Sequence, residues 1–284
     1  MSPDVGRSGP PHSNVGMQEG ILPPAVLLET GNSLLDALPR AEYRRLLPHL
    51  ELVSLPVGKV VSEAGERVTH AYFPTTAIVS LVTMLEGHPA GEVAVVGHDG
   101  MLGMSLLLEG EGAMQPLRSA FVQSPGHAYR LPADILVKEL SGSVELKQLL
   151  LRYLQALVTQ IGQIAVCNRH HRIVARLCRW LLLRLDRSPS CEIEITHEQL
   201  AKLLGVRREG VTAAARSLQR AGAIRIQRAC ITVLDRSKLQ QRGCECYAVI
   251  RREYARLIAH GHQRDDPDRP LGSERARHRR SRRT

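Results

Sequence analysis

The most informative stretch of the sequence is Ile195-Thr-His-Glu-Gln-Leu-Ala-Lys-Leu-Leu-Gly-Val-Arg-Arg-Glu-Gly-Val-Thr-Ala-Ala-Ala-Arg-Ser-Leu218. It predicts two short helices joined by a tight turn. Thr196, followed three residues later by Gln199, forms a capping-box pattern that satisfies the free backbone N–H groups at a helix start. Gly205 permits the left-handed backbone that a sharp turn requires. We therefore expect the first helix to end at Gly205.

The second helix is expected from about Arg207 to Arg220, with one apolar and one polar face. The residues expected to face inward are Val211, Ala214, Ala215 and Leu218. Those free to face outward are Arg207, Arg208, Glu209, Thr212 and Arg216. This layout is typical of a helix-turn-helix, whose second helix enters the major groove of DNA. The alternative is an ordinary helical hairpin with a basic, solvated face.

The segment after the helical pair favours the first interpretation. Gly222 stops the second helix, and two short alternating runs, Ala223 to Gln227 and Cys230 to Leu234, predict a small β-hairpin. A helix-turn-helix followed by such a hairpin is a winged helix. Arg225 and Arg228 lie on or near the wing, where their guanidinium groups are candidates to contact phosphates.

The charge of the 284-residue chain is unevenly divided. Its net charge is +10, but residues 1–140 carry 9 Lys and Arg against 15 Asp and Glu, whereas the rest carries 29 against 13. An acidic front and a basic back suggest a sensing or core domain joined to a domain that binds a polyanion. Basic charge supplies affinity for phosphates without selecting a sequence.

The N-terminal segment and the cysteines indicate the compartment. Residues 1–31 are expected to be disordered because they begin with a stretch rich in Pro, Gly and Ser. They lack the basic start and apolar core of a secretory signal. The sequence contains no run of about 18 apolar residues, so we expect no membrane-spanning helix. The six cysteines, all at or after Cys167, are then expected to be reduced thiols. We expect a cytoplasmic protein that does not act at a membrane.

Residues 32–140 are expected to form a β domain. One or two short helices are expected from Asn32 to Leu50. From Glu51 to about Leu131, short β-forming runs alternate with turns rich in Gly and Pro. Many short strands at such spacing predict an all-β sandwich or barrel.

Residues 141–170 are expected to form a long helix that ends in a hinge. Its apolar residues step by three or four positions: Leu146, Leu150, Tyr153, Leu157, Ile161 and Ile164. A stripe this long predicts contact with the β domain and with a second copy of the chain. A helix-turn-helix normally reads two half-sites through a two-fold axis, which favours this dimer interface. A helix packed only on its own domain is the alternative.

The remaining boundaries follow from these segments. The winged helix-turn-helix domain is expected at residues 171–250, and its first helix is expected from about Arg172 to Leu185. Residues 251–284 are a C-terminal extension whose basic tail, Arg275 to Arg283, is expected to be disordered. The tail either adds salt-sensitive affinity for DNA or merely solubilises the chain.

This order of parts resembles the Crp/Fnr superfamily of bacterial transcription regulators. The resemblance covers about residues 32–250 and is strongest from Ile195 to Asp235. It implies an α+β fold with an N-terminal antiparallel β-roll of the cyclic-nucleotide-binding type, a long dimerisation helix and a C-terminal winged helix-turn-helix. It also implies a homodimer on a two-fold symmetric promoter site, with an effect transmitted to RNA polymerase.

The resemblance also implies which residues read the DNA. Arg208 and Glu209 match the Arg-Glu pair of the family's recognition helix, but Ala213 stands where a second Arg is typical. An Arg can donate to guanine O6 and N7, and a Glu can accept from cytosine N4, whereas Ala offers only an apolar contact. We therefore expect an altered half-site, with Arg207 and Thr212 contacting a base or only the backbone.

The candidate effector pocket matches the family only in part. The loop that carries a ribose-binding Glu in cyclic-nucleotide-binding members is here Gly100-Met101-Leu102-Gly103, and Met101 cannot accept a hydroxyl hydrogen bond. Arg118 and Ser119 do match the phosphate-binding element, where an Arg fork suits a cyclic phosphate. A site built around a carboxylate binds poorly without it. We expect a degenerate pocket with another ligand or none.

The cysteines allow two weak metal hypotheses. No Cys precedes Cys167, so the resemblance does not extend to the N-terminal iron–sulfur site of the Fnr branch. The two groups considered are Cys244 and Cys246 with Cys230 or His197, and Cys167 with His170 and His171. Cys-x-Cys is not a strong zinc spacing, so buried thiols and a solvated hinge are favoured. We predict no metal and no cofactor.

The sequence also argues against an enzyme. It contains no nucleophile–base motif, no phosphate-binding Walker loop and no His-Glu-x-x-His pattern. We therefore predict no catalytic residues.

Overall fold

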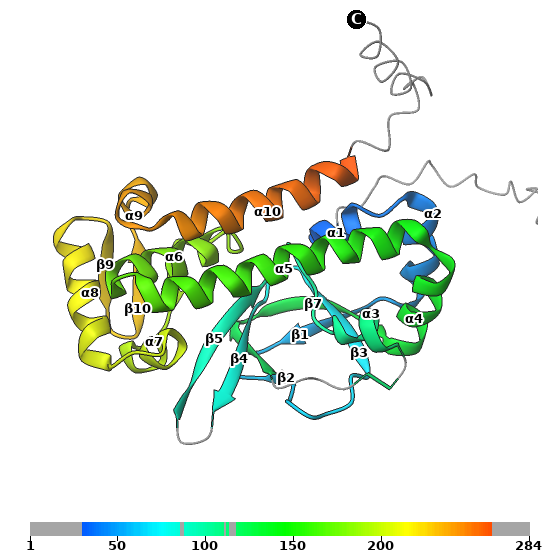
Figure 1. Ribbon diagram of the computed structural model, residues 1–284, viewed down its shortest axis with the longest axis horizontal. Helices are drawn as coiled ribbons and strands as arrows, with labels where there is room; N and C mark the ends of the chain where they lie inside the picture. Colours follow the sequence, from blue (N-terminus) through cyan, green and yellow to red (C-terminus); the bar gives the residue numbers. More distant parts are fainter. Residues whose placement is uncertain (1–29, 86–87, 111, 114–117, 263–284) are drawn as a thin grey trace, which may run out of the picture.

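The computed structural model describes residues 30–85, 88–110, 112–113 and 118–262. A β-roll lies beneath one long helix, and a second helical unit with a small sheet lies at one end of that helix (Figure 1). The antiparallel β-roll and the helix-turn-helix agree with the predicted α+β class. The predicted N-terminal disorder, apart from residues 30 and 31, and the predicted basic tail lie outside the described residues.

The β-roll contains two antiparallel sheets. The three-stranded sheet has the order β1–β7–β3, and the four-stranded sheet has the order β2–β6–β4–β5. Their bounds are β1 Glu51–Leu55, β2 Val60–Ser62, β3 His70–Pro74, β4 Ile78–Leu85, β5 His88–Val96, β6 Arg118–Ser124 and β7 Gly126–Pro132. Buried Ile, Val, Leu and Ala side chains of both sheets form the core between them, as alternating strands require.

Short helices close the roll. They are α1 Ser33–Asp36, α2 Arg40–Leu46, the 3-10 turn Leu47–His49, α3 Ser105–Glu109 and α4 Ala133–Gly142. Asn32 caps α1 by accepting from the N–H groups of Leu34 and Leu35, while its amide donates to the Pro74 and Gly100 carbonyls. This one side chain therefore fixes the first helix to the end of β3 and to the loop at Gly100.

The long helix α5 covers Val144–His170 and begins at a Ser143 cap. It packs against β5 and against the C-terminal helix α10, Glu245–His262, which lies alongside it (Figure 1). By length and composition alone α5 is apolar enough to cross a membrane. Nine of its 27 residues are buried within the protein, on the side that packs against β5 and α10.

The predicted dimer stripe occupies the inner face of α5. Five of its six side chains are buried within their own chain: Leu146, Leu150, Tyr153, Leu157 and Ile164. The sixth, Ile161, is half-buried. The large apolar side chains of α5 that remain exposed lie outside this stripe, at Val144, Leu151, Val158 and Val166. The sequence pattern did not separate the two stripes, because both repeat at helical spacing.

The C-terminal unit contains the predicted winged helix and more. It comprises α6 Ile173–Leu185, β8 Glu192–Glu194, α7 His197–Leu204, α8 Arg208–Arg220, β9 Ile224–Gln227, β10 Cys230–Val233 and α9 Arg236–Arg242. Strand β8 pairs with β10 and makes the wing a three-stranded sheet. Helix α10 continues beyond residue 250, the predicted end of this domain, and returns along α5.

Two buried ion pairs join the β-roll to α6. Arg184 Nη2 lies 2.5 Å from Glu92 Oε2 on β5, and the Ser80 hydroxyl donates to the same oxygen at 2.6 Å. The Arg184 guanidinium also stacks 3.5 Å from the centre of the Trp180 ring. Just beyond α6, Arg187 binds both oxygens of Asp99, at 2.9 and 2.7 Å. Hydrogen-bonded pairs of this kind are how proteins tolerate buried charge.

Candidate nucleic-acid interface

The predicted capping box and turn are both present in α7. Thr196 accepts from the Gln199 N–H at 3.1 Å, and the Gln199 side chain accepts from the Thr196 N–H at 2.9 Å. Gly205 ends the helix in the left-handed region at φ 61°. The buried Arg176 of α6 donates to the Leu204 carbonyl, which would otherwise lack a partner at the helix end. The turn is thus stabilised by the left-handed backbone of Gly205 and by the hydrogen bond from Arg176.

Helix α8 has the two predicted faces. Val211, Ala214, Ala215 and Leu218 are buried against the unit. Arg207, Arg208, Glu209 and Arg216 are exposed, and Ala213 is exposed between them. Thr212 is half-buried, and its hydroxyl donates to the Arg208 carbonyl at 3.0 Å. This places four charged side chains and one small residue on the outer face of the helix.

The wing brings further basic side chains to the same side. Arg225 on β9 and Arg228 in the turn are exposed, and Ala229 completes the turn at φ 56°. A hollow of about 300 Å³ lies between the start of α7, the start of α8 and the wing, and both Arg208 and Arg228 line it. The structure thus brings together a predicted base-reading residue and a predicted phosphate-binding residue.

His197 is a member of this surface that the sequence pattern did not identify. It is the first residue of α7, its Nδ1 lies 3.0 Å from the Thr212 hydroxyl, and it lines the same hollow. Burial lowers its pKa below the usual 6.5, and the positive charges of Arg208 and Arg216 lower it further. At neutral pH the imidazole is therefore uncharged. The sequence alone does not show that His197 lies next to Thr212, because this contact depends on the geometry of the turn between α7 and α8.

The pKa of His197 tests whether the positive charge of Arg208 lies close to its imidazole ring. In the DNA-free protein, the His197 pKa is expected below 6.5 by NMR titration of its ring proton. Arg208→Ala should raise it, because a neighbouring positive charge is removed. Arg220→Ala, at the far end of α8, serves as the matched control and should leave it unchanged. An identical His197 pKa in Arg208→Ala and the wild type would contradict this arrangement.

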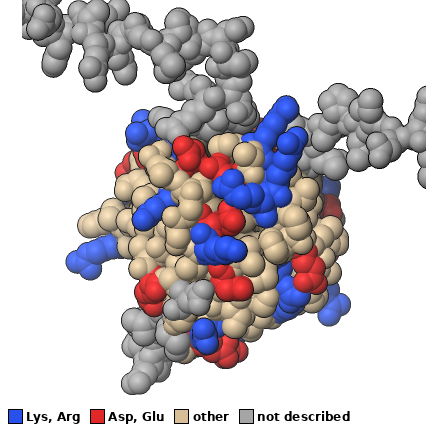
Figure 2. Space-filling model, turned by 90° about the vertical axis from the view of Figure 1, so that its right-hand side faces the viewer, with Lys and Arg blue, Asp and Glu red and all other residues tan. Residues whose placement is uncertain are grey.

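The opposite end of the molecule has a different charge pattern. There, Lys and Arg side chains are interspersed with Asp and Glu side chains over an otherwise uncharged surface (Figure 2). The outer face of α8 and the wing present five exposed arginines, Arg207, Arg208, Arg216, Arg225 and Arg228, against three exposed carboxylates, Glu209 on α8 and Glu192 and Glu194 on β8. An excess of guanidinium groups over carboxylates is the electrostatic pattern expected for binding a polyanion.

The loop predicted as an effector pocket is tightly packed. Met101 is buried in the core, and its carbonyl accepts a 2.9 Å hydrogen bond from the Tyr153 hydroxyl of α5. A Cβ atom at Gly100 would lie 2.6 Å from the same hydroxyl oxygen, so only glycine fits there. Gly103 has a φ of 92° and lies close to the backbone of His70. The loop therefore contacts α5 directly through its backbone.

The space near this loop is small. A hollow lined by Gly103, Leu102, Tyr72 and residues of the 61–70 segment has a volume of about 90 Å³. Small-molecule sites usually enclose about 300–1,000 Å³. Among the described residues, neither Met101 nor Ser119 lines this hollow. Arg118 begins β6, but its side chain lies outside the described part of the chain.

The fold joins a winged helix-turn-helix, which presents this surface, to a cyclic-nucleotide-binding-like β-roll. Residues 175–242 match the family described as the Crp-like helix-turn-helix domain. No curated protein matches the chain. The family match assigns a Crp-like helix-turn-helix to residues 175–242 of the chain.

Solved structures share the fold at low sequence identity. A putative transcriptional regulator of the Crp/Fnr family from Eubacterium rectale is 17% identical, with a TM-score of 0.58, over 75% of this chain and 98% of that one. A CRP/FNR-family transcriptional regulator from Thermus thermophilus is 23% identical, with a TM-score of 0.52, over 68% and 100%. The c-di-GMP-responsive global regulator CLP of Xanthomonas campestris is 13% identical, with a TM-score of 0.51, over 69% and 99%. All three are described as regulators.

Proposed function

We propose that this protein is a homodimeric transcription regulator that binds a two-fold symmetric promoter site in the cytoplasm and acts on RNA polymerase. The exposed face of α8, with Arg208 and Glu209 at its start, carries the proposal. The N-terminal residues of a recognition helix are those that reach base edges in the major groove. The matched family domain at residues 175–242 supports the same role.

The proposed contacts divide into two kinds. Arg208 and Glu209 read bases, because both are exposed in the first turn of α8 and carry groups that match guanine and cytosine. Arg207 and Arg216 contact nearby bases or phosphates, and Arg225 and Arg228 of the wing contact phosphates. Thr212 has a smaller part, since its hydroxyl already donates to the Arg208 carbonyl and mainly holds the start of the helix.

The proposed dimer contact is the outer face of α5. Val144, Leu151, Val158 and Ala165 recur every seven residues, and all four are exposed. Leu154 and Ile161 lie half-buried between them. A seven-residue apolar repeat is the pattern by which two helices pack in a coiled coil. Of the stripe predicted from sequence, only Ile161 thus belongs to this contact, because the other members already pack inside their own chain.

We propose that the β-roll does not use the cyclic-nucleotide site of its fold. Met101 replaces the ribose-binding carboxylate and is buried, and the adjacent hollow is small. A different ligand remains compatible with the fold, since the similar regulator from Xanthomonas campestris responds to c-di-GMP.

The decisive experiment is selection of bound duplexes from a random pool by the purified, reduced protein, with and without cyclic AMP. A palindrome recovered without ligand is the expected result. A palindrome recovered only with cyclic AMP would refute the degenerate pocket. Failure to select any sequence under either condition would refute sequence-specific binding by the protein alone.

Two substitutions separate base reading from phosphate binding. Arg208→Ala should cost about 1–3 kcal/mol on the selected site and relax preference at one base pair. Arg228→Ala should weaken all sequences alike and reduce the slope of affinity against salt concentration. Fluorescence anisotropy on the selected site and its single-base variants distinguishes them. Equal losses on every duplex for Arg208→Ala would contradict its role in reading bases.

A further inference from the structure

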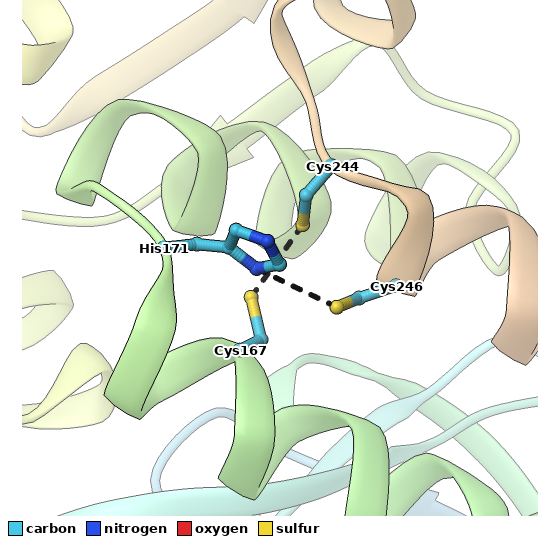
Figure 3. A group of neighbouring side chains, drawn as sticks. All are labelled: Cys167, His171, Cys244 and Cys246. Atoms are coloured by element: carbon cyan, nitrogen blue, oxygen red, sulfur yellow. Dashed lines mark hydrogen bonds between the residues drawn. The ribbon is translucent and has the colours of Figure 1, made fainter.

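Three thiols and one imidazole converge where α5, α6 and α10 meet. Cys167 lies in the last turn of α5, His171 in the link to α6, and Cys244 and Cys246 at the start of α10. All four side chains point toward one another (Figure 3). The sequence analysis considered Cys244 and Cys246 in one group and Cys167 and His171 in another. The fold brings these four residues together.

The spacing of the four ligand atoms suits a single tetrahedral ion. Cys167 Sγ lies 3.5 Å from Cys244 Sγ, and Cys246 Sγ lies 3.6 Å from His171 Nδ1. All four atoms lie within 4.8 Å of one another. Zinc binds sulfur at about 2.3 Å and imidazole nitrogen at about 2.0–2.1 Å, so tetrahedral ligands are separated by roughly 3.5–3.8 Å. The remaining pairs, all within 4.8 Å, would have to approach by at most about 1 Å when an ion binds.

The histidine is oriented as a metal ligand. Its Nδ1 faces the thiols, while its Nε2 lies 3.5 Å from a carboxylate oxygen of Glu245. Metal-binding histidines usually direct the second ring nitrogen to such a group, which fixes the tautomer and orients the ring. Glu245 lies between the two cysteines of α10, so the same helix start supplies two ligands and this carboxylate.

A buried positive charge lies beside the group. Arg179 of α6 is buried, and its charge acts on the Cys167 thiol. None of the ion pairs found among the described residues includes Arg179, although it donates to the Ile164 carbonyl. Three thiolates and one divalent ion carry a net charge of −1, and such a centre supplies the counter-charge that a buried guanidinium requires.

We propose that Cys167, His171, Cys244 and Cys246 bind one thiophilic divalent metal ion of the zinc class. Four protein ligands leave no open position, so the site is structural rather than catalytic. In an iron–sulfur cluster the thiolates bind several different irons and do not converge on one point. The four ligand atoms here converge, so a single ion fits them better than a cluster does. The ion connects the start of α10 to the end of α5 and to the hinge before α6.

Metal content of the full-length protein tests the site. Protein purified with reductant and without chelator is expected to contain one zinc per chain by elemental analysis. Cys244→Ser and Cys246→Ser should each lose that equivalent. Cys191→Ser, which changes an exposed thiol outside the group, is the matched control and should retain it. Retention of a full equivalent by folded Cys244→Ser and Cys246→Ser would overturn the assignment.

Two further measurements use the wild-type protein, so they test the site even if the variants fail to fold. Cobalt added to metal-free, reduced protein should give the intense visible bands of tetrahedral cobalt–thiolate. Zinc should also protect Cys244 from alkylation, while Cys191 reacts equally with and without metal. The weak spectrum of hydrated cobalt, or unprotected Cys244, would overturn the proposal. So would iron with acid-labile sulfide, or a Cys167–Cys244 disulfide in freshly isolated, metal-free protein.

Discussion

Arg184→Ala is expected to lower the free energy of unfolding by about 3–5 kcal/mol, the usual cost of removing one partner of a buried ion pair. The Arg184 side chain is 1% exposed and the Glu92 side chain 5% exposed. Without Arg184, the Glu92 carboxylate retains only the Ser80 hydroxyl as its partner among the contacts described. Burial lowers the pKa of Arg184, and the negative charge of Glu92 opposes this change, so each group depends on the other.

Urea unfolding followed by circular dichroism measures this loss, and the single tryptophan, Trp180, reports it separately because Arg184 stacks on its ring. Two controls define the cause. The double variant Arg184→Met with Glu92→Leu removes both charges and should lose much less stability. Lys202→Ala breaks an exposed pair with Glu198 and should cost at most about 1 kcal/mol. Similar losses for the single and double variants would attribute the effect to packing rather than to charge.

Val158→Glu is expected to convert the proposed dimer into a monomer. The side chain is 55% exposed at the centre of the outer face of α5, so the substitution spares the core of the protomer. In a dimer it would place two like charges against each other in an apolar contact, where neither has a partner. Loss of the second half-site contact should reduce affinity for the palindrome by at least about a hundredfold.

Sedimentation and anisotropy on full and half palindromes test this expectation. Leu108→Glu makes the same kind of change at an exposed leucine of α3 and should leave both the dimer and its affinity intact. A dimeric Val158→Glu protein with full affinity would place the contact elsewhere.

Local signals predicted the C-terminal unit well. Thr196, Gln199 and Gly205 act within a few residues of one another, so their sequence already specifies the cap and the turn. The apolar faces of α7 and α8 follow from the same short-range periodicity. Because these patterns need no distant partner, the outward placement of Arg208 and Glu209 was also predictable.

Features that depend on distant partners were missed. Strand β8 has only three residues and is stabilised by pairing with β10, which follows only after α7, α8 and β9. The inner stripe of α5 was predicted to contact both the β domain and a second copy of the chain, because the return of α10 along this helix was not anticipated. The convergence of Cys167 and His171 with Cys244 and Cys246 has the same origin, since the contact exists only once α10 is in place.

The two arginines that join α6 to the β-roll also limit how this protein can be recombined. Arg184 and Arg187 find their carboxylates, Glu92 and Asp99, only in the N-terminal domain. A DNA-binding half cut free at the hinge would lose both partners and expose the apolar surface around them. A chimera with a foreign sensor would need acidic residues at the same two places. The two halves of this protein therefore depend on each other's side chains, and exchange of one half would require redesign of the other.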